Sequence, residues 1–201
     1  MENMLDILKE KEIEVATSLI NGGLTMAKSC MEQILQSPFD LEKIDYGKSD
    51  QVPNFTSEKG GTLHLVKTEL KGQLSGSCFL IFSQEEVDRI NKVCLPEDVL
   101  VDDSEESRMM KTAFLKEMDN MVAAAVVTEF SNILGLELFG DVPTATVMDS
   151  EKVDEFLASE SSVFESIIHF KALFKGKELD ISPDFIWMFS NQFVDKIKNL
   201  V

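Results

Sequence analysis

The sequence predicts an α+β fold in which two duplicated halves, related by a pseudo-twofold axis, each lay a long helix on one face of an antiparallel sheet. Residues 65–72 resemble residues 169–176 at an offset of 104, so the chain repeats itself. In both halves an apolar helical pattern comes first, strand-like alternation follows, and a short helical pattern closes the half. Hydrophobic residues make up 44% of the chain, which is enough apolar material for a packed core.

The repeat divides the chain into residues 1–100 and 104–201, which we expect to form one domain over residues 1–201. Such a domain is what a homodimer becomes when its two copies are fused into one chain. Because the fused chain already contains the pairing, we expect a monomer.

A long helix is predicted at the start of each half. In the first half it covers about residues 4–36, and Gly22-Gly23 predict a kink or a break within it. In the second half it starts near Ser104, which is a good N-cap and is followed by glutamates that suit the first turn. It runs to about Leu134 and stops at Gly135, because glycine readily adopts the left-handed C-terminal conformation.

Three strands and a short helix are predicted to follow in each half. The capping-box pattern Ser83-x-x-Glu86 starts the short helix of the first half, and the corresponding helix of the second half starts near Ser190. The second half has an additional helical stretch at residues 150–158. The predicted strands cover about residues 39–45, 61–71, 76–82, 142–148, 163–174 and 178–189.

The charge balance excludes two classes of partner. The chain has 19 basic and 36 acidic side chains and a net charge of −17. A polyanion of this kind is repelled by the phosphate backbone of nucleic acids and by anionic lipid. We therefore expect no nucleic-acid partner and no membrane partner.

Apolar runs and cysteine usage indicate the compartment. The longest apolar run, residues 121–127, is far shorter than the ~20 residues that span a bilayer, and the first residues are acidic where a secretory signal is basic. Cys30, Cys78 and Cys94 are an odd number at unrelated spacings, which favours reduced thiols over a disulfide framework. These features predict a cytoplasmic protein.

Several other kinds of site lack support in the sequence. His64 and His169 occupy equivalent places in the repeat and fall in predicted strands without a third metal ligand nearby, so we interpret them as strand residues. The sequence has no phosphate-binding glycine loop and no nucleophile-elbow motif. The acidic run at residues 102–106 is interpreted as a solvated linker and helix start.

Glu117 and Asn120 form the candidate site. They are three residues apart in the predicted helix of the second half, so both side chains share one helix face. Asparagine is a mediocre residue for a helix interior, which suggests a role beyond helix formation. Pro143 follows Asn120 after an interval of 22 residues, at the start of a predicted strand, and completes the pattern E-x2-N-x22-P.

This pattern resembles the signature of the CheC/CheX/FliY family of chemotaxis phosphatases, which dephosphorylate the response regulator CheY in signal transduction. The resemblance covers essentially the whole chain and implies a CheC-like fold. It also implies a hydrolase that acts on the aspartyl phosphate of a CheY-type response regulator. By this resemblance Asn120 holds the attacking water in line with the phosphoryl group, and Glu117 pairs with the active-site lysine of the regulator.

The physical chemistry of the reaction agrees with such a role. The regulator's own Mg²⁺ and lysine already neutralise the phosphoryl group, so what remains to be supplied is the position of one water molecule. A carboxamide suits this task because it is neutral and carries both a donor and an acceptor. The resemblance therefore implies no cofactor and no metal on this chain, with Mg²⁺ expected on the partner.

The sequence departs from the family pattern in both halves. Ala113 stands four residues before Glu117, where the family usually has aspartate or serine. In the first half the equivalent positions hold Glu12, Val15 and Pro38. Because valine has no amide to orient water, we interpret this half as a degenerate second site.

Two alternatives stay open at this stage. The chain could be a non-catalytic interaction module on the same fold, as in the flagellar switch protein FliM. It could also be an adaptor that acts through CheD, the deamidase partner of CheC. An intact Glu117–Asn120 pair favours the enzyme, and CheD binding is compatible with it.

Overall fold

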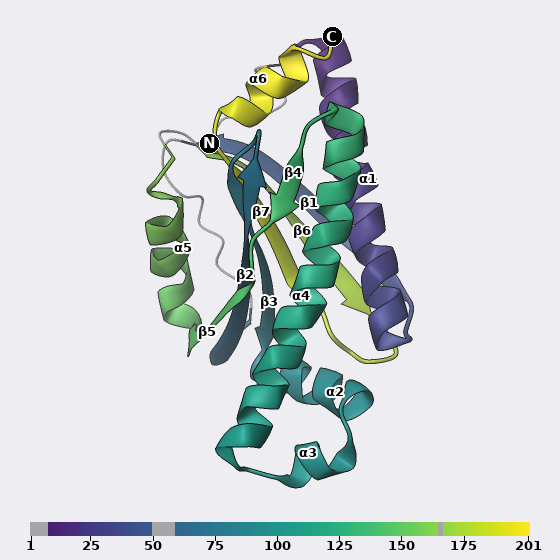
Figure 1. Ribbon diagram of the computed structural model, residues 1–201, viewed down its shortest axis with the longest axis vertical. Helices are drawn as coiled ribbons and strands as arrows, with labels where there is room; N and C mark the ends of the chain where they lie inside the picture. The colour runs from purple at the N-terminus through teal and green to yellow at the C-terminus, as the bar shows by residue number, and fades with distance from the viewer. Residues whose placement is uncertain (1–7, 50–58, 165–166) are drawn as a thin grey trace.

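The computed structural model describes residues 8–49, 59–164 and 167–201, and in this part of the chain one seven-stranded antiparallel sheet carries helices on both faces (Figure 1). The strand order is β1-β6-β7-β3-β2-β4, and β5 also pairs with β2. The strands are β1 (Phe39–Ser49), β2 (Thr62–Gly72), β3 (Gly76–Ser83), β4 (Leu138–Gly140), β5 (Thr144–Asp149), β6 (Ile167–Gly176) and β7 (Asp184–Phe189).

The two long helices lie side by side on one face of the sheet (Figure 1). The α-helices are α1 (Glu10–Leu35), α2 (Gln84–Cys94), α3 (Glu97–Val101), α4 (Glu105–Leu134), α5 (Val153–Ser161) and α6 (Gln192–Lys198), with a 3-10 turn, η2, at Ser150–Lys152. Helices α2 and α6 lie at opposite ends of the molecule, whereas α5 covers the other face of the sheet (Figure 1). The predicted α+β class with an antiparallel sheet is therefore confirmed.

The strand order has an internal symmetry. If β1, β2 and β3 are exchanged with β5, β6 and β7, respectively, the same strands are neighbours. The pair β1–β6 then becomes the pair β5–β2, and the central pair β3–β7 is exchanged with itself. This is the order that two repeats joined through their third strands would produce. The division into two pseudo-repeats of one domain stays a prediction.

The core has two parts, one on each side of the sheet. Beneath α1 and α4, Phe130 packs against Trp187 and Phe170, with ring centroids 5.7 and 6.4 Å away. On the other face, Val153 and Leu157 of α5 pack with buried side chains of β2, β3, β6 and β7. The two long helices thus lie on one face, as expected, and the additional helix α5 covers the other, because both faces of the central strands are apolar.

Of the kink or break predicted at Gly22-Gly23, the structure contradicts the break. Helix α1 is continuous from Glu10 to Leu35, and the glycines lie where it contacts α4. A Cβ atom at Gly23 would lie 2.7 Å from Cε1 of Phe130 and 3.0 Å from Cγ1 of Val126. These glycines therefore permit a close helix–helix approach.

Element boundaries differ from the predictions mainly in the second half. The strand predicted at 178–189 begins at Asp184, because the preceding residues form a turn in which Asp180 has a φ of 50°. The strand predicted at 142–148 begins at Thr144, after the separate short strand β4. Residues 4–7 of the first predicted helix and residues 165–166 of the strand predicted at 163–174 lie outside the described residues.

Candidate active site

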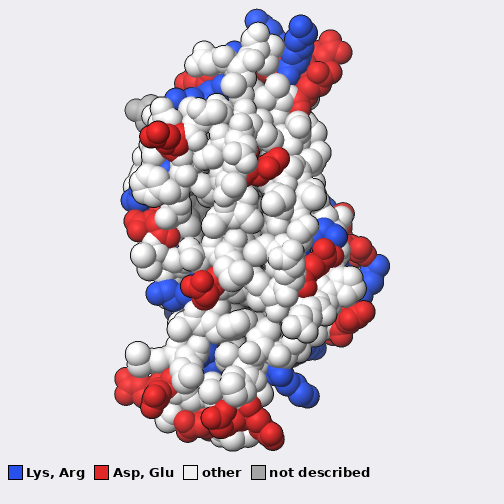
Figure 2. All heavy atoms as spheres, turned by 45° about the vertical axis from the view of Figure 1, so that its right-hand side comes forward, with Lys and Arg blue, Asp and Glu red and all other residues white. Residues whose placement is uncertain are grey.

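Helix α4 carries both candidate residues and is capped at both ends. The Ser104 hydroxyl accepts a hydrogen bond from the backbone N–H of Ser107 at 3.1 Å, and Gly135 ends the helix with a φ of 63°. Figure 2 shows acidic side chains gathered at the end of the molecule where α3 and α4 begin. The surface between this end and the opposite end is mostly uncharged in the same view.

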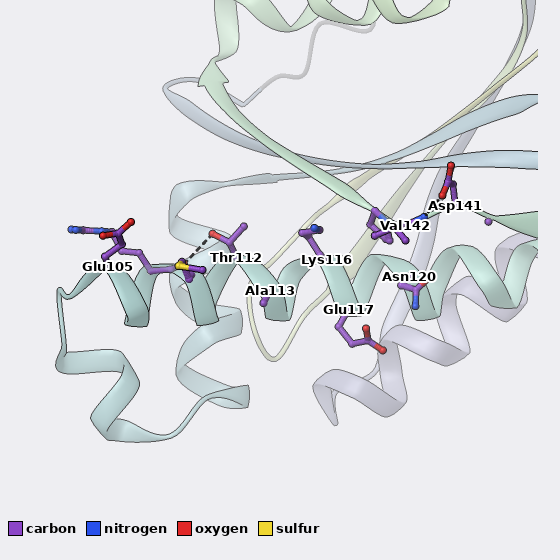
Figure 3. Close-up of a pocket in the computed structure, with 12 residues that line it drawn as sticks. Glu105, Thr112, Ala113, Lys116, Glu117, Asn120, Asp141 and Val142 are labelled. Carbon is purple, nitrogen blue, oxygen red and sulfur yellow. Dashed lines mark hydrogen bonds between the residues drawn. The ribbon is translucent and has the colours of Figure 1, made fainter.

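The buried stripe of α4 leaves Glu117 and Asn120 on its margin. Leu115, Met118 and Val122 recur at helical spacing and are buried. Glu117 is exposed and Asn120 is half-buried, and both project from the same side of the helix (Figure 3). Glu117 forms no ion pair with any described residue, so its carboxylate is available to a partner.

An open groove of about 790 Å³ lies beside these residues. One wall is α4, from Glu105 to Asn120, and the other is the segment from Gly140 to Pro143 (Figure 3). Glu117, Asn120 and Pro143, which the sequence pattern singled out, all line this groove. The structure thus brings the three residues of the pattern to one place.

Strand pairing explains the shape of the second wall. Leu70 of β2 pairs with Gly140, and Lys67 pairs with Thr144, so the intervening residues 141–143 leave the regular ladder. Proline is suited to this position because it has no N–H to donate to a neighbouring strand. Pro143 is buried at the base of this wall, directly before β5.

Ion pairs connect the second wall of the groove to β2. Glu69 of β2 lies 2.9 Å from Nζ of Lys67 and 2.6 Å from Nζ of Lys71, and Lys71 lies 3.7 Å from Asp141. Hydrogen bonds from Lys71 and Lys67 lower the pKa of Glu69 to about 2. The backbone N–H of Asp141 also donates to the carbonyl of Glu69 at 2.8 Å. The start of this wall is therefore tied to β2.

Sequence reasoning missed several polar residues at the site, among them Arg108 and Thr112, which line the groove. Lys116 and Asp141 also line the groove, and Asp119 is fully buried beneath it. The Thr68 hydroxyl donates a hydrogen bond to Asp119 Oδ2 at 2.7 Å, and burial raises the pKa of Asp119 to about 7. Asp119 follows the apolar Met118 on the stripe that faces the sheet, which is the one signal in the sequence that could have revealed its burial.

The corresponding residues of the first half have other surroundings. Glu12 is buried, and its Oε2 accepts a hydrogen bond from the backbone N–H of Lys9 at 2.7 Å, as part of the cap of α1. Val15 is half-buried against the core, and Pro38 is exposed. Glu12 is therefore engaged in its own helix, unlike Glu117. That these positions derive from a second site stays a prediction.

Other chemistry has little support in the described residues. No group of three or more histidine, cysteine, aspartate or glutamate side chains in the described ranges could hold a metal ion. His64 and His169 lie in β2 and β6, as predicted, and all three cysteines are free thiols. Among the helices of the described part of the chain, none has the length and apolar character needed to cross a membrane.

Comparisons with known proteins find proteins of the CheC, CheX and FliY type that are similar to this chain. No protein-family model matches the chain. The CheY-P phosphatase CheC of Bacillus subtilis (strain 168) is 25% identical over 166 residues, which cover 80% of this chain and 78% of that protein. Among solved structures, Thermotoga maritima FliY has a TM-score of 0.67 at 17% identity and covers 96% of both chains.

The chain is similar to the CheC-like proteins in sequence and in fold. Two further structures share this fold. The CheX–CheY complex with BeF3 and Mg from Borrelia burgdorferi contains a chain with a TM-score of 0.59 at 17% identity, covering 86% of this chain and 97% of that one. The FliM middle domain from Vibrio alginolyticus has a TM-score of 0.57 at 12% identity, covering 93% and 99%. The fold is thus found both in a protein solved in complex with CheY and in the FliM middle domain.

Proposed function

We propose that this CheC-like chain hydrolyses the aspartyl phosphate of a CheY-type response regulator. The observation that supports this most strongly is the open groove that Glu117, Asn120 and Pro143 line together. An exposed carboxylate and a half-buried amide on the same side of a helix can both reach a partner protein. The similarity to the CheY-P phosphatase CheC of Bacillus subtilis and to the CheX–CheY complex agrees with this substrate.

In this mechanism Asn120 holds the attacking water in line with the phosphorus–oxygen bond. Its side-chain carbonyl accepts from the water and its NH2 group can donate to a phosphoryl oxygen. Because the amide is neutral, it approaches the negative phosphoryl group without repulsion. The rate gain comes from fixing one water in a productive position.

Glu117 supplies the orientation of the complex. Its exposed carboxylate pairs with the active-site lysine of the regulator, which is a charge-assisted contact. Lysine and Mg²⁺ of the regulator balance the charge of the phosphoryl group, so this chain needs no cofactor of its own. Exposed Met109 and Val142, which also line the groove, offer apolar surface for the rest of the partner.

The remaining features of the proposal follow from the sequence. We expect the chain to act as a monomer in the cytoplasm. CheD is a second candidate partner, and neither nucleic acid nor membrane is expected to bind.

A phosphate-release assay tests this function against the alternatives. A CheY-type receiver domain is phosphorylated, and its loss of phosphate is followed with and without the purified chain. We expect the chain to accelerate the loss at least about tenfold, because positioning effects of this kind are large. Binding of the receiver without acceleration would instead support an interaction module like FliM. Capture of CheD without acceleration would support the adaptor.

A further inference from the structure

Asp119 is an unusual residue for its place in α4. Its side chain is fully buried on the face that contacts the sheet, directly before Asn120 in the chain. Oδ2 accepts the hydrogen bond from the Thr68 hydroxyl at 2.7 Å, whereas Oδ1 accepts none from any described residue. A buried carboxyl with one unmet acceptor costs stability, and an apolar pair of similar volume would be more favourable. A contribution to stability therefore does not explain why Thr68 and Asp119 are paired here.

Thr68 lies between the two walls of the groove. On one side it holds α4 through Asp119. On the other side its Cγ2 would lie 3.0 Å from a Cβ atom at Gly140, where the second wall begins. Thr68 also occupies the stretch of β2 between the partners of Gly140 and Thr144, opposite the segment that leaves the ladder. One residue thus contacts both walls.

The strand that carries Thr68 is a firm support. β2 is paired with β3 on one side and with β4 and β5 on the other. Thr68 pairs in register with Cys78 of β3, which is fully buried. A hydrogen bond to this position fixes the height and the rotation of α4 more narrowly than apolar contacts do, because hydrogen bonds weaken steeply with distance and angle.

We propose that Asp119 is a positioning residue, which holds Asn120 at a fixed distance from the wall formed by residues 141–143 through its hydrogen bond to Thr68. The proposal rests on the proposed function of Asn120 and adds the support that this function needs. Adjacent residues of a helix move together, so a displaced Asp119 displaces Asn120. A misplacement of about 1 Å in such a site can lower the rate by about a hundredfold.

Asp119 is titratable, so its hydrogen bond to Thr68 depends on the groups that surround it. Asp119 acts on the buried Cys78 of β3, since burial together with the charge of Asp119 raises the pKa of this thiol well above its ordinary value. Thr68 of β2 provides a hydroxyl, and the α4 neighbours Leu115 and Val122 are apolar. The pKa of Asp119 itself is raised by burial and lowered by the hydrogen bond from Thr68, and no charged side chain of the described residues contributes to its shift.

A double variant, Thr68→Val with Asp119→Leu, separates positioning from stability. It replaces the polar pair by apolar groups, so the protein should stay folded with an unchanged or higher urea midpoint. We expect kcat for phosphorylated receiver to fall about tenfold or more while KM changes less than about twofold. The single variants Asp119→Asn and Thr68→Ser keep the acceptor and the hydroxyl, so both should retain most of the wild-type kcat. A double variant with the wild-type kcat would overturn the proposal.

A control and a second measurement keep the result decisive. Val126→Ala removes a buried side chain of α4 farther along the helix, and it should lower the urea midpoint without lowering kcat at a temperature where it is folded. The NMR signals of the Asn120 side-chain NH2 group report its position without any enzyme assay. They should shift in the double variant and stay near the wild-type positions in Asp119→Asn. Unchanged signals in the double variant would refute positioning, whereas a wild-type protein that fails to hydrolyse the receiver would refute the proposed function alone.

Discussion

The stability of the protein should depend on pH through Asp119, and Asp119→Asn should remove this dependence. The side chain is fully buried with one hydrogen bond, and burial raises its pKa from 3.8 to about 7. A raised pKa in the folded state means that folding takes up a proton at pH values between these two limits. Wild-type stability should therefore fall as the pH rises from about 4 through about 7, and then level off.

The size of the effect follows from the two pKa values. A difference between 3.8 and about 7 corresponds to about 4 kcal/mol across the whole window. Part of this loss occurs below pH 5, so about 2.5 kcal/mol remains between pH 5 and pH 8. The variant has no proton to release at this position, and it keeps an oxygen that can accept from Thr68.

Urea unfolding of both proteins at pH 5 and pH 8 measures the effect. Other titrating groups are common to the two proteins, so the difference between their unfolding free energies isolates Asp119. Between pH 5 and pH 8, the free energy of unfolding of the variant should rise by about 2.5 kcal/mol relative to that of the wild type. This corresponds to roughly 1 M in urea midpoint. A difference that is the same at both pH values would show that Asp119 does not titrate in this range, and would refute the reasoning from burial.

Three other predictions concern different parts of the molecule. Gly23→Ala should lower the free energy of unfolding by roughly 1–3 kcal/mol, because its Cβ would press on Phe130, and an unchanged urea midpoint would contradict the contact. The Glu69 carboxyl should stay ionised down to a pH of about 2 in an NMR titration, and Lys71→Met should raise its pKa toward the ordinary value. Glu117→Ala should weaken binding to a receiver loaded with beryllofluoride roughly tenfold and reduce the salt dependence of binding, which calorimetry at two salt concentrations would detect.

Three residues of the groove were predictable because their spacing carries geometry. Glu117 and Asn120 are three apart in a capped helix, which fixes their common side, and Pro143 marks the start of a strand. The internal repeat likewise predicts the order of helices and strands. Local patterns of this kind need no knowledge of the neighbouring elements.

The rest depends on contacts between elements that are distant in sequence. Gly22-Gly23 predict a kink or a break when α1 is considered alone, but they permit contact with α4 once the helices are packed. The helical spacing places Asp119 on the apolar stripe of α4, but its hydrogen-bond partner Thr68 follows only from the position of β2 beneath α4. The burial of the second sheet face by α5 depends in the same way on where the chain returns after β5.

Asn120 is proposed to position the water that hydrolyses the aspartyl phosphate, and the most direct test of this role is the single-turnover rate with Asn120→Ala. Alanine is the better helix former, so α4 should remain intact and the urea midpoint should change little. We expect the rate of phosphate loss from a saturated receiver complex to fall by about a hundredfold or more, with nearly unchanged affinity for a beryllofluoride-loaded receiver. Thr128→Ala, at an exposed position of the same helix, should keep the wild-type rate. An Asn120→Ala protein that hydrolyses the receiver at the wild-type rate would contradict the account.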